Sequence, residues 1–549
     1  MAGNPYAAKP WLNLYAKGQP ADLTARYETM LVAFRAAVAE AGDRPAILFG
    51  DACISFAELD AAADRLAGWA VAQGVRQGDR IAIILQNVPA FAIATVAAWK
   101  LGAIPVPGNP MYRAGEIARQ FADSHPALLI CHADHESEVR EALASIDEQH
   151  PVLTVPTDGS DDPATPGSLA AAVAEGGPTP PPVSVAGEDL GLMLYTSGTT
   201  GAPKAAMLTH ATLAWNSEAM AHWFGIDAEA KVLGIAPLFH ITGFVAHLTM
   251  AIVARCPLIL TGRFDPARTL AVIRRERPTW MVGAVTAFNA LASLPDVNLD
   301  DFTSFHRVDS GGAPIAPALR ETIATRIGHK LLSAYGMTET ASVTHSCPIG
   351  REVPVDPESG ALSVGVPYIG TEAMVADEAG NPVPIGEVGE IWMRGPQVMT
   401  GYWNKPAETA AALTDGWMHS GDVGFMNAEG WFFLVDRKKD CIIASGFKVW
   451  PREVEDVLHT HPAVREAAVV GAPDDYRGET VIAHVSLRSG ATVSEAELIG
   501  HCRERLAAYK VPRFVRIAEE LPKTATGKIQ RNVLREAEAA AISRAAASA

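Results

Sequence analysis

Residues 195–204 read Tyr-Thr-Ser-Gly-Thr-Thr-Gly-Ala-Pro-Lys, and this stretch decides how the rest of the chain is interpreted. It places five hydroxyl side chains, two glycines and a lysine in ten positions. Glycine lets backbone N–H groups approach an anion closely, hydroxyl groups donate to phosphate oxygens, and lysine supplies positive charge. The apolar run 190–194 predicts a buried strand immediately before it. We therefore expect a phosphate-binding loop rather than a flexible, solvated connection.

The loop differs from a Walker A sequence. That motif needs four residues between its glycines and a Ser or Thr directly after its lysine. Here two residues separate Gly198 from Gly201, and Pro203 and Ala205 flank Lys204. The residues that we expect to contact phosphate are Thr196, Ser197, Gly198, Thr199, Thr200, Gly201 and Lys204.

The motif resembles the phosphate-binding loop of the adenylate-forming superfamily, which includes acyl-CoA and aryl-CoA ligases, firefly-type luciferases and the adenylation domains of peptide synthetases. Further motifs of that superfamily follow in order and extend the resemblance over about residues 40–535. The resemblance implies an α/β fold with a large N-terminal domain of several subdomains, residues 1–438, that binds ATP and the acyl group. It also implies a small, mobile α+β C-terminal domain, residues 439–549, with the hinge at Lys439.

Bulk properties set limits on the kind of protein. A chain of 549 residues is too long for one hydrophobic core, so we expect at least two domains. The net charge of −17 argues against nucleic-acid binding through a basic surface. Six scattered cysteines form no CxxC pair, which indicates neither a disulfide framework nor a zinc site and suits a reducing cytoplasm.

Targeting and membrane signals are weak. Residues 1–10 lack the apolar core of a signal peptide. The most apolar long stretch, 245–260, contains His247 and Arg255 and is too short to cross a bilayer comfortably. It is expected to be a buried helix followed by a strand.

Helix and strand signals alternate in the first part of the chain. Ser55 and Glu58 have the spacing of a capping box, and Pro89 opens a second predicted helix. Strands are expected at 80–85 and 127–131, which favours α/β layering. The Pro-rich segment 156–184 shows little periodicity and is expected to be an exposed connection.

The composition changes again after Val435. The charge run 436–440 is followed by signals for a compact α+β domain. The Ala-rich tail 537–549 is expected to fray. The predicted elements of this domain are a helix near 451–458, strands near 467–471 and 481–487, and a helix from Ser494, which has capping-box spacing with Glu497.

Three short motifs fit a bound nucleotide. Residues 309–314, Asp-Ser-Gly-Gly-Ala-Pro, permit close approach of a flat ligand, although a tight turn explains them equally well. Residues 335–339, Tyr-Gly-Met-Thr-Glu, offer a flat ring, a hydroxyl group and a carboxylate of the kind that Mg²⁺ prefers; a helix capped by Thr338 is the alternative. Asp422, in the sequence His-Ser-Gly-Asp, suits two ribose hydroxyls, although this is also good turn chemistry.

The resemblance assigns roles to these motifs. It implies that Glu339 binds the metal ion and that Thr338 and Glu339 act in catalysis. The nucleotide contacts that it implies outside the phosphate loop are Gly312, Ala313, Pro314, Tyr335, Gly336, Asp422 and Arg437.

The resemblance also implies two catalytic residues far apart in the chain. Lys528, in the sequence Lys-Thr-Ala-Thr-Gly-Lys-Ile, is implied to enter the active site during adenylation, where two anions must approach each other. His240, in Pro-Leu-Phe-His, is implied to lie at the carboxylate end of the acyl pocket; a core histidine is the alternative. The predicted acyl pocket contains Phe239, His240, Phe244, Gly311 and Gly336.

Segments after the charge run resemble those of CoA ligases. We predict coenzyme A contacts at Ser445, Gly446, Phe447, Arg477 and Arg503. No carrier-protein domain follows residue 535, which argues against a peptide-synthetase module, although a separate carrier protein stays an alternative acceptor.

We therefore predict an AMP-forming acid–CoA ligase that uses ATP, Mg²⁺ and coenzyme A. The leader 9–15 resembles that of bacterial fatty-acyl-CoA ligases, and residues 240–244 resemble a segment of aryl-acid ligases. A medium- or long-chain fatty acid is the first choice of substrate and an aromatic acid the second. Loading of a carrier protein and non-catalytic binding are the rival functions. A homodimer and peripheral contact with a membrane are left open.

Overall fold

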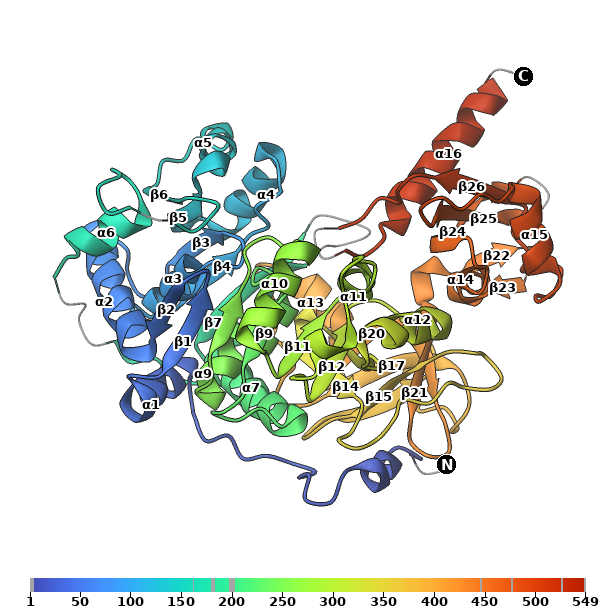
Figure 1. Ribbon diagram of the computed structural model, residues 1–549, viewed down its shortest axis with the longest axis horizontal. Coiled ribbons are helices and arrows are strands. Elements are labelled where there is room, and N and C mark those ends of the chain that lie inside the picture. Colours follow the sequence, from blue (N-terminus) through green and yellow to red (C-terminus); the bar gives the residue numbers. More distant parts are fainter. Residues whose placement is uncertain are drawn as a thin grey trace.

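The computed structural model describes residues 4–160, 162–178, 183–196, 203–444, 447–474, 477–524 and 527–547. Figure 1 shows a large body, coloured blue to orange, and a smaller body, coloured orange to red. The chain passes from one to the other at the turn Lys438–Asp440. We call residues up to Arg437 the large body and residues from Cys441 onward the small body.

A parallel sheet with helices on both faces forms near the start of the large body. Its spatial order is β4-β3-β5-β6. Along β3, Ile81 and Ile83 pack in the core that contains α2 and α3, whereas Ala82 and Ile84 pack in the core that contains α4 and α5. A strand buried on both faces reads as a continuous apolar run, as predicted for 80–85. The elements are α2 (Phe56–Ala72), β3 (Arg80–Ile84), α3 (Pro89–Lys100), β4 (Ile104–Pro107), α4 (Ala114–Ser124), β5 (Pro126–His132), α5 (Glu136–Ser145) and β6 (Val152–Val155).

Both predicted helix starts in this region are confirmed. Ser55 and Glu58 form a reciprocal capping box at the first turn of α2. Pro89 is the first residue of α3, where its missing N–H has no helical partner to lose.

The second sheet has fourteen strands among the described residues and positions the predicted site. Its order is β16-β17-β20-β21-β15-β14-β13-β12-β11-β9-β10-β1-β2, with β19 beside β20. The stretch from β1 to β13 is parallel, so β11, β12 and β13 end at one edge of the sheet. The strands are β1 (Pro45–Phe49), β2 (Ala52–Ser55), β9 (Val232–Gly234), β10 (Leu258–Leu260), β11 (Trp280–Gly283), β12 (Arg307–Gly311), β13 (Leu332–Met337), β14 (Ser342–Ser346), β15 (Ser363–Pro367), β16 (Glu372–Ala376), β17 (Gly389–Arg394), β19 (Leu413–Thr414), β20 (Trp417–Met426) and β21 (Phe432–Arg437).

The remaining helices of the large body pack on this sheet and beside it. The apolar stretch 245–260 contains a buried π-helical segment, Phe244–Thr249, then a short helix and the strand β10, which confirms the predicted order of a helix followed by a strand. The helices are α1 (Met30–Ala41), α7 (His210–Phe224), α8 (Ile241–Gly243), α9 (Met250–Ala254), α10 (Pro266–Glu276), α11 (Val285–Ala292), α12 (Pro317–Ile327) and α13 (Pro406–Ala412).

An antiparallel hairpin carries the predicted phosphate loop. The loop separates β7 (Leu190–Thr196) from β8 (Lys204–Thr209), and these two strands pair with each other. The strand predicted before the loop is therefore confirmed. A third strand, β18 (Gly401–Tyr402), pairs with β8, and this pairing brings a distant part of the chain to the loop.

The small body has its own hydrophobic core around a five-stranded sheet. The predicted helix near 451–458 is α14, and the capping box of Ser494 with Glu497 starts α15. The predicted strands fall within β24 and β25, which pair with each other. The elements are β22 (Ile442–Ala444), β23 (Phe447–Val449), α14 (Pro451–His459), β24 (Val464–Asp474), β25 (Gly478–Leu487), α15 (Glu495–Arg503), β26 (Phe514–Ala518) and α16 (Arg531–Ala547).

The expectation of an exposed connection at 156–184 was wrong. The segment 156–184 contains α6 (Leu169–Glu175), which starts at a Ser168 cap and buries Leu169 and Ala172. A seven-residue helix is too short to show a clear helical period. The Ala-rich tail continues α16 to Ala547, as the high helix propensity of alanine favours, and fraying of its end stays a prediction.

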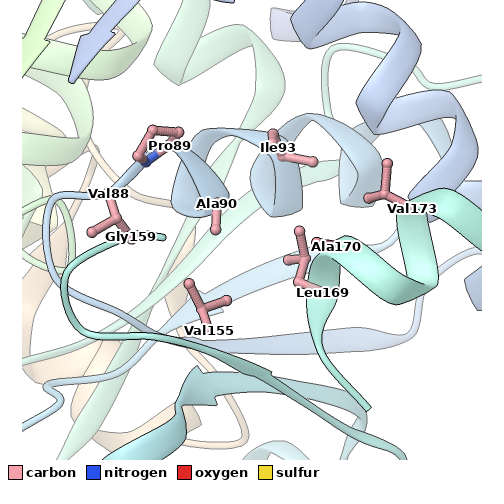
Figure 2. Close-up of a pocket in the computed structure, with 9 residues that line it drawn as sticks. All are labelled: Val88, Pro89, Ala90, Ile93, Val155, Gly159, Leu169, Ala170 and Val173. Carbon is pink, nitrogen blue, oxygen red and sulfur yellow. The ribbon is translucent and has the colours of Figure 1, made fainter. Parts of the chain in front are cut away.

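The helix α6 closes an apolar cavity of about 170 Å³ against α3 (Figure 2). In Figure 1, α6 lies at the end of the large body opposite to the small body. Its lining residues are Val88, Pro89, Ala90, Ile93, Val155, Gly159, Leu169, Ala170 and Val173.

Candidate active site

Lys528 of the small body lies against Gly312 of the large body. A Cβ atom placed on Gly312 would lie 2.9 Å from the Lys528 Cε atom and 3.5 Å from its Nζ atom. Gly312 follows the end of β12 and has a φ of +82°. Any other residue would therefore be strained and would also displace the lysine. Gly527, which precedes Lys528 in the chain, lies close against α11. A Cβ atom placed on Gly527 would lie 2.4 Å from Thr286 Oγ1.

The surroundings of Lys528 oppose its charge. Burial and the nearby Arg437 guanidinium lower the pKa of Lys528 to about 8, and the Asp422 and Glu339 carboxylates limit the decrease. Its main chain is held by the loop itself, because its N–H donates to Thr524 Oγ1 at 3.1 Å. The lysine is protonated at neutral pH and close to losing its proton.

Asp422, Tyr335 and Arg437 form a hydrogen-bonded group beside the lysine. The Tyr335 hydroxyl donates to Asp422 Oδ2 at 2.7 Å, and Arg437 Nε donates to Asp422 Oδ1 at 3.2 Å. Asp422 and Arg437 are directly opposite each other on β20 and β21. Burial, and then Asp422, raises the pKa of Tyr335 well above its usual value, so the ring stays neutral.

Tyr402 links the predicted metal ligand to the predicted phosphate lysine. Its hydroxyl donates to Glu339 Oε1 at 2.6 Å, and the Lys204 ammonium lies 4.6 Å from the centre of its ring. The pairing of β18 with β8 fixes this geometry. Sequence reasoning missed Tyr402, because its two partners are distant in the chain and a Gly-Tyr pair carries no signal of its own.

The donor set near Glu339 fits Mg²⁺ bound through nucleotide phosphates. Mg²⁺ in such sites takes one or two carboxylates and leaves its other positions to phosphate and water. Glu339 is a buried carboxylate with one oxygen engaged by Tyr402. The described residues contain no group of three or more His, Cys, Asp or Glu that could hold a metal ion by themselves.

His240 caps the short helix α8 and lies within electrostatic reach of the lysine. Its Nδ1 accepts from the Thr242 N–H at 3.4 Å. Burial, and then the charge of Lys528, lowers the pKa of His240 to about 3, so the imidazole is neutral. The preceding residues are held by Asn87, which donates to the carbonyls of Gly234 and Ala236 and accepts from the Leu238 N–H. Asn87 was also missed by sequence reasoning.

The predicted acyl-pocket residues lie around the same strand ends. Phe239 is buried beside His240, and Gly311 is so close to β13 that a Cβ would lie 2.6 Å from the Ala334 carbonyl oxygen. A Cβ on Gly336 would overlap the Ser342 carbonyl oxygen, at 1.6 Å. Phe244 lies deeper, because its ring meets Phe91 and Trp99 edge-on inside the core.

The other residues of the predicted nucleotide motifs follow the ends of strands. Ala313 and Pro314 follow Gly312 after β12, and Thr338 follows β13 in a short turn ending at Thr340. The turn starts from Met337, so the alternative of a helix capped by Thr338 is wrong. Thr196 ends β7 at the loop. Ser197, Gly198, Thr199, Thr200 and Gly201 lie outside the described residues.

The predicted coenzyme A residues are spread over the small body. Phe447 is exposed and stacks on Tyr509 with ring centres 4.8 Å apart. Arg477 and Arg503 are exposed, the first before β25 and the second at the end of α15. Ser445 and Gly446 lie outside the described residues. Lys439 is exposed in the turn Lys438–Asp440.

Two further findings are not confined to the predicted site. No helix in the described ranges is long and apolar enough to cross a membrane. All six cysteines are among the described residues, and each is a free thiol.

Comparison with known proteins places the chain in a family. The model for AMP-binding enzymes matches residues 34–403, and the model for the C-terminal domain of AMP-binding enzymes matches residues 453–528. A long-chain-fatty-acid–CoA ligase of Bacillus subtilis is 36% identical over 557 residues, which cover 96% of this chain and 98% of the relative. A feruloyl-CoA synthase of an Amycolatopsis species is 36% identical over 493 residues, which cover 89% of this chain and 95% of the relative.

Solved structures agree with this placement. The anthranilate CoA ligase AuaEII in complex with anthranoyl-AMP has a TM-score of 0.87 at 26% identity, covering 95% of this chain and 99% of that one. ATP-bound MatB from Rhodopseudomonas palustris has a TM-score of 0.83 at 31% identity, covering 93% and 99%. The chain belongs to the AMP-binding enzymes, with their adenylate-forming fold. It is an AMP-forming acid–CoA ligase, which uses a small carboxylic acid, ATP with Mg²⁺, and coenzyme A.

Proposed function

We propose that the residues around Lys528 carry the adenylation half of the reaction. The observation that supports this best is the placement of one ammonium group, half-buried and against Gly312, beside Asp422, Arg437, Glu339 and His240. A carboxylate and a triphosphate repel each other, so a positive charge between them lowers the barrier to their reaction. Lys528 is assigned this role.

Each neighbouring group has a proposed task. Asp422 accepts hydrogen bonds from the ribose hydroxyls, with Arg437 and Tyr335 holding its carboxylate in place. Lys204 and the loop before it bind phosphate. Glu339 and Thr338 hold the metal and phosphate end, where Mg²⁺ when bound supplies charge to the phosphates. His240 stays neutral and orients the carboxylate of the acid, since an imidazole with a pKa of about 3 cannot supply charge at neutral pH.

The reaction proceeds in two steps. In the first, a carboxylate oxygen of the acid attacks the α-phosphorus of ATP, and the bond to pyrophosphate breaks. In the second, the thiol of coenzyme A attacks the acyl carbon, AMP leaves, and the thiol proton goes to solvent. We assign Ser445, Gly446, Phe447, Arg477 and Arg503 to the second step. The large domain is residues 1–438 and the small domain is residues 439–549. Rotation about Lys439 removes Lys528 from the site and brings the coenzyme A residues of the small domain to it.

The proposed acid is a medium- or long-chain fatty acid. The fatty-acid ligase relative matches 96% of the chain, whereas the feruloyl-CoA relative matches 89%. The leader segment is part of the fold here, because Trp11 in Pro10–Leu14 is buried against Phe432 with ring centres 6.0 Å apart. An aromatic acid is the second candidate, because the feruloyl-CoA relative has the same identity and a solved neighbour is an anthranilate ligase.

A pyrophosphate-release screen tests the function and the acid together. Purified enzyme is supplied with fatty acids of graded length and with aromatic acids, each with and without coenzyme A. We expect the highest rate with a medium- or long-chain acid, and AMP release that depends on coenzyme A. AMP release without it, or only with an added carrier protein, would favour the rival function of loading a carrier.

The role of Lys528 has its own test. We expect Lys528→Ala to lower acyl-AMP formation about a hundred- to a thousandfold, the usual cost of removing one preorganised charge. Synthetic acyl-AMP and coenzyme A should still give thioester at close to the normal rate. Pyrophosphate release at the normal rate in this variant would exclude the assignment.

The setting of the enzyme is also a proposal. Six free thiols, four of them buried, suit a reducing cytoplasm. Sedimentation velocity tests the open question of a homodimer, and flotation with vesicles tests peripheral membrane contact.

A further inference from the structure

One arginine of the small body contacts carboxylates on both sides of the proposed hinge. Arg531 is three residues after Lys528 and starts α16. Its guanidinium lies 3.3 Å from Asp436 in β21 and 3.6 Å from Asp440, just after the hinge. It also lies 2.5 Å from Glu455 in α14. Of the three carboxylates, only that of Asp436 belongs to the large body.

Asp436 of the large body accepts a hydrogen bond from the N-terminus of α14 in the small body. Its side chain is only 2% exposed. Its Oδ2 accepts from the Arg452 N–H at 2.9 Å, in the first turn of α14, and the N-cap residue of that helix makes no side-chain cap. Arg452 Nη1 also donates to the Leu434 carbonyl oxygen at 2.8 Å. These contacts tie α14 to β21.

The structure shows the contacts of Asp436 in one orientation of the two bodies. The proposed rotation about Lys439 would move α14 and α16 together, so Arg531 would keep Glu455 and Asp440 but lose Asp436. The same rotation would remove the acceptor of the Arg452 N–H. Hydrogen bonds to a charged group are the stronger kind, so their loss changes the balance between two orientations measurably.

We propose that Asp436, with Arg531 and Arg452, forms a latch that holds Lys528 over Gly312 for adenylation and that opens before transfer to coenzyme A. Arg531 is thus a positioning residue for Lys528. This inference rests on the proposed two-step reaction. It adds the residues that set how long the enzyme stays in the first orientation.

The test compares the two half-reactions in matched variants. Asp436→Asn removes the charge of the one carboxylate of the large body that contacts Arg531. It leaves the contacts of Arg531 with Glu455 and Asp440. We expect it to lower the rate of acid-dependent pyrophosphate exchange roughly ten- to a hundredfold, the range for losing a hydrogen bond to a charged group. Thioester formation from synthetic acyl-AMP and coenzyme A should stay normal or increase.

Arg535→Gln is the control. Arg535 is one turn further along α16 and contacts Asp440 at 2.9 Å, within the hinge turn and the small body. We expect both half-reactions of this variant to stay within about twofold of normal, since no contact to the large body is lost. If Asp436→Asn does not fold, Arg531→Lys takes its place, and we expect a smaller change in the same direction.

A measurement without acid separates this inference from the function itself. Hydrogen exchange at the Arg452 amide should be faster in Asp436→Asn than in the normal enzyme and unchanged in Arg535→Gln. If no acid supports pyrophosphate release, the proposed function fails and the exchange result still decides on the latch. Normal exchange at Arg452, or an equal decrease of both half-reactions in a variant that melts normally, would overturn the latch.

Discussion

The surroundings of the Lys528 ammonium group favour the loss of its proton. Its pKa is lowered to about 8 by burial and by Arg437. The lysine of the unfolded chain titrates near 10.5. The two values predict a dependence on pH for both activity and stability.

Adenylation should decrease as the pH rises through about 8, because Lys528 loses the charge that it supplies. The contribution of Lys528 to the free energy of unfolding should change with pH in the opposite sense. Between about pH 8 and 10.5 the unfolded chain binds more protons at Lys528 than the folded one, so the contribution of this group to stability rises with pH.

The measurement is kcat/KM for pyrophosphate exchange against pH. Lys528→Arg should be slower but should lose the decrease near pH 8, because a guanidinium stays charged. Thioester formation from synthetic acyl-AMP should show no decrease over the same range. An unchanged alkaline limb in Lys528→Arg would assign it to another group.

At the scale of elements, the short strand β18 determines how the predicted phosphate and metal residues are placed. It pairs with β8 directly after the phosphate loop. The Met399 N–H, just before it, donates to the Glu339 carbonyl oxygen at 2.8 Å. Tyr402 at its end contacts Glu339 and Lys204. Two predicted site residues from separate elements are therefore aligned by one strand.

Tyr402→Phe should weaken the apparent affinity for Mg²⁺ more than the affinity for the acid. It removes the hydrogen bond to Glu339 and keeps the ring under Lys204. We expect the Mg²⁺ concentration for half-maximal rate to rise by roughly tenfold, the lower end for a hydrogen bond to a charged group. Calorimetric titration with MgATP checks the same change without turnover.

Tyr402→Leu is the matched variant, since it also removes the ring. It should further weaken ATP binding through the lost cation–π contact, worth about 0.5–2 kcal/mol. If the Phe variant has normal Mg²⁺ dependence while the Leu variant loses activity, the ring and not the hydroxyl is the part that matters.

At the scale of the whole molecule, the turn Lys438–Asp440 joins two bodies that have separate hydrophobic cores. Lys439 is exposed in this turn, whereas Asp440 is paired with Arg531 and Arg535 of the small body. Contacts between the bodies include those of Asp436 with Arg452 and Arg531 and those of the lysine loop at Gly312 and Thr286. Such an arrangement can move as two rigid parts.

Lys439→Pro should separate the two half-reactions at this scale. Proline has a φ near −65°, which suits the turn of 3₁₀ type seen here, so the present orientation is kept. The ring fixes φ at this residue and so opposes the backbone change that rotation needs. We expect pyrophosphate exchange to stay close to normal and thioester formation to fall on the order of a hundredfold, if the second orientation loses about 3 kcal/mol.

Both half-reactions are measured on one preparation, with Lys439→Ala as the control that leaves the backbone free. A Pro variant that makes thioester from acyl-AMP at the normal rate would place the hinge elsewhere.

Motifs that are local in the chain were sufficient to predict much of this protein. The fold class and the reaction were correctly predicted, because glycine-rich loops, capping boxes and apolar runs act over a few neighbouring residues. The roles of Lys528, Asp422 and Glu339, and the boundary at Lys439, stay predictions.

Tertiary structure alone decided which residues meet. Tyr402 is 63 residues from Glu339, and Arg531 is 95 residues from Asp436, so no local pattern relates them. The pairing of β18 with β8 and the docking of α14 on β21 create these contacts. The lowered pKa of Lys528 likewise comes from burial between two bodies, a property that a lysine in a polar loop does not have by itself.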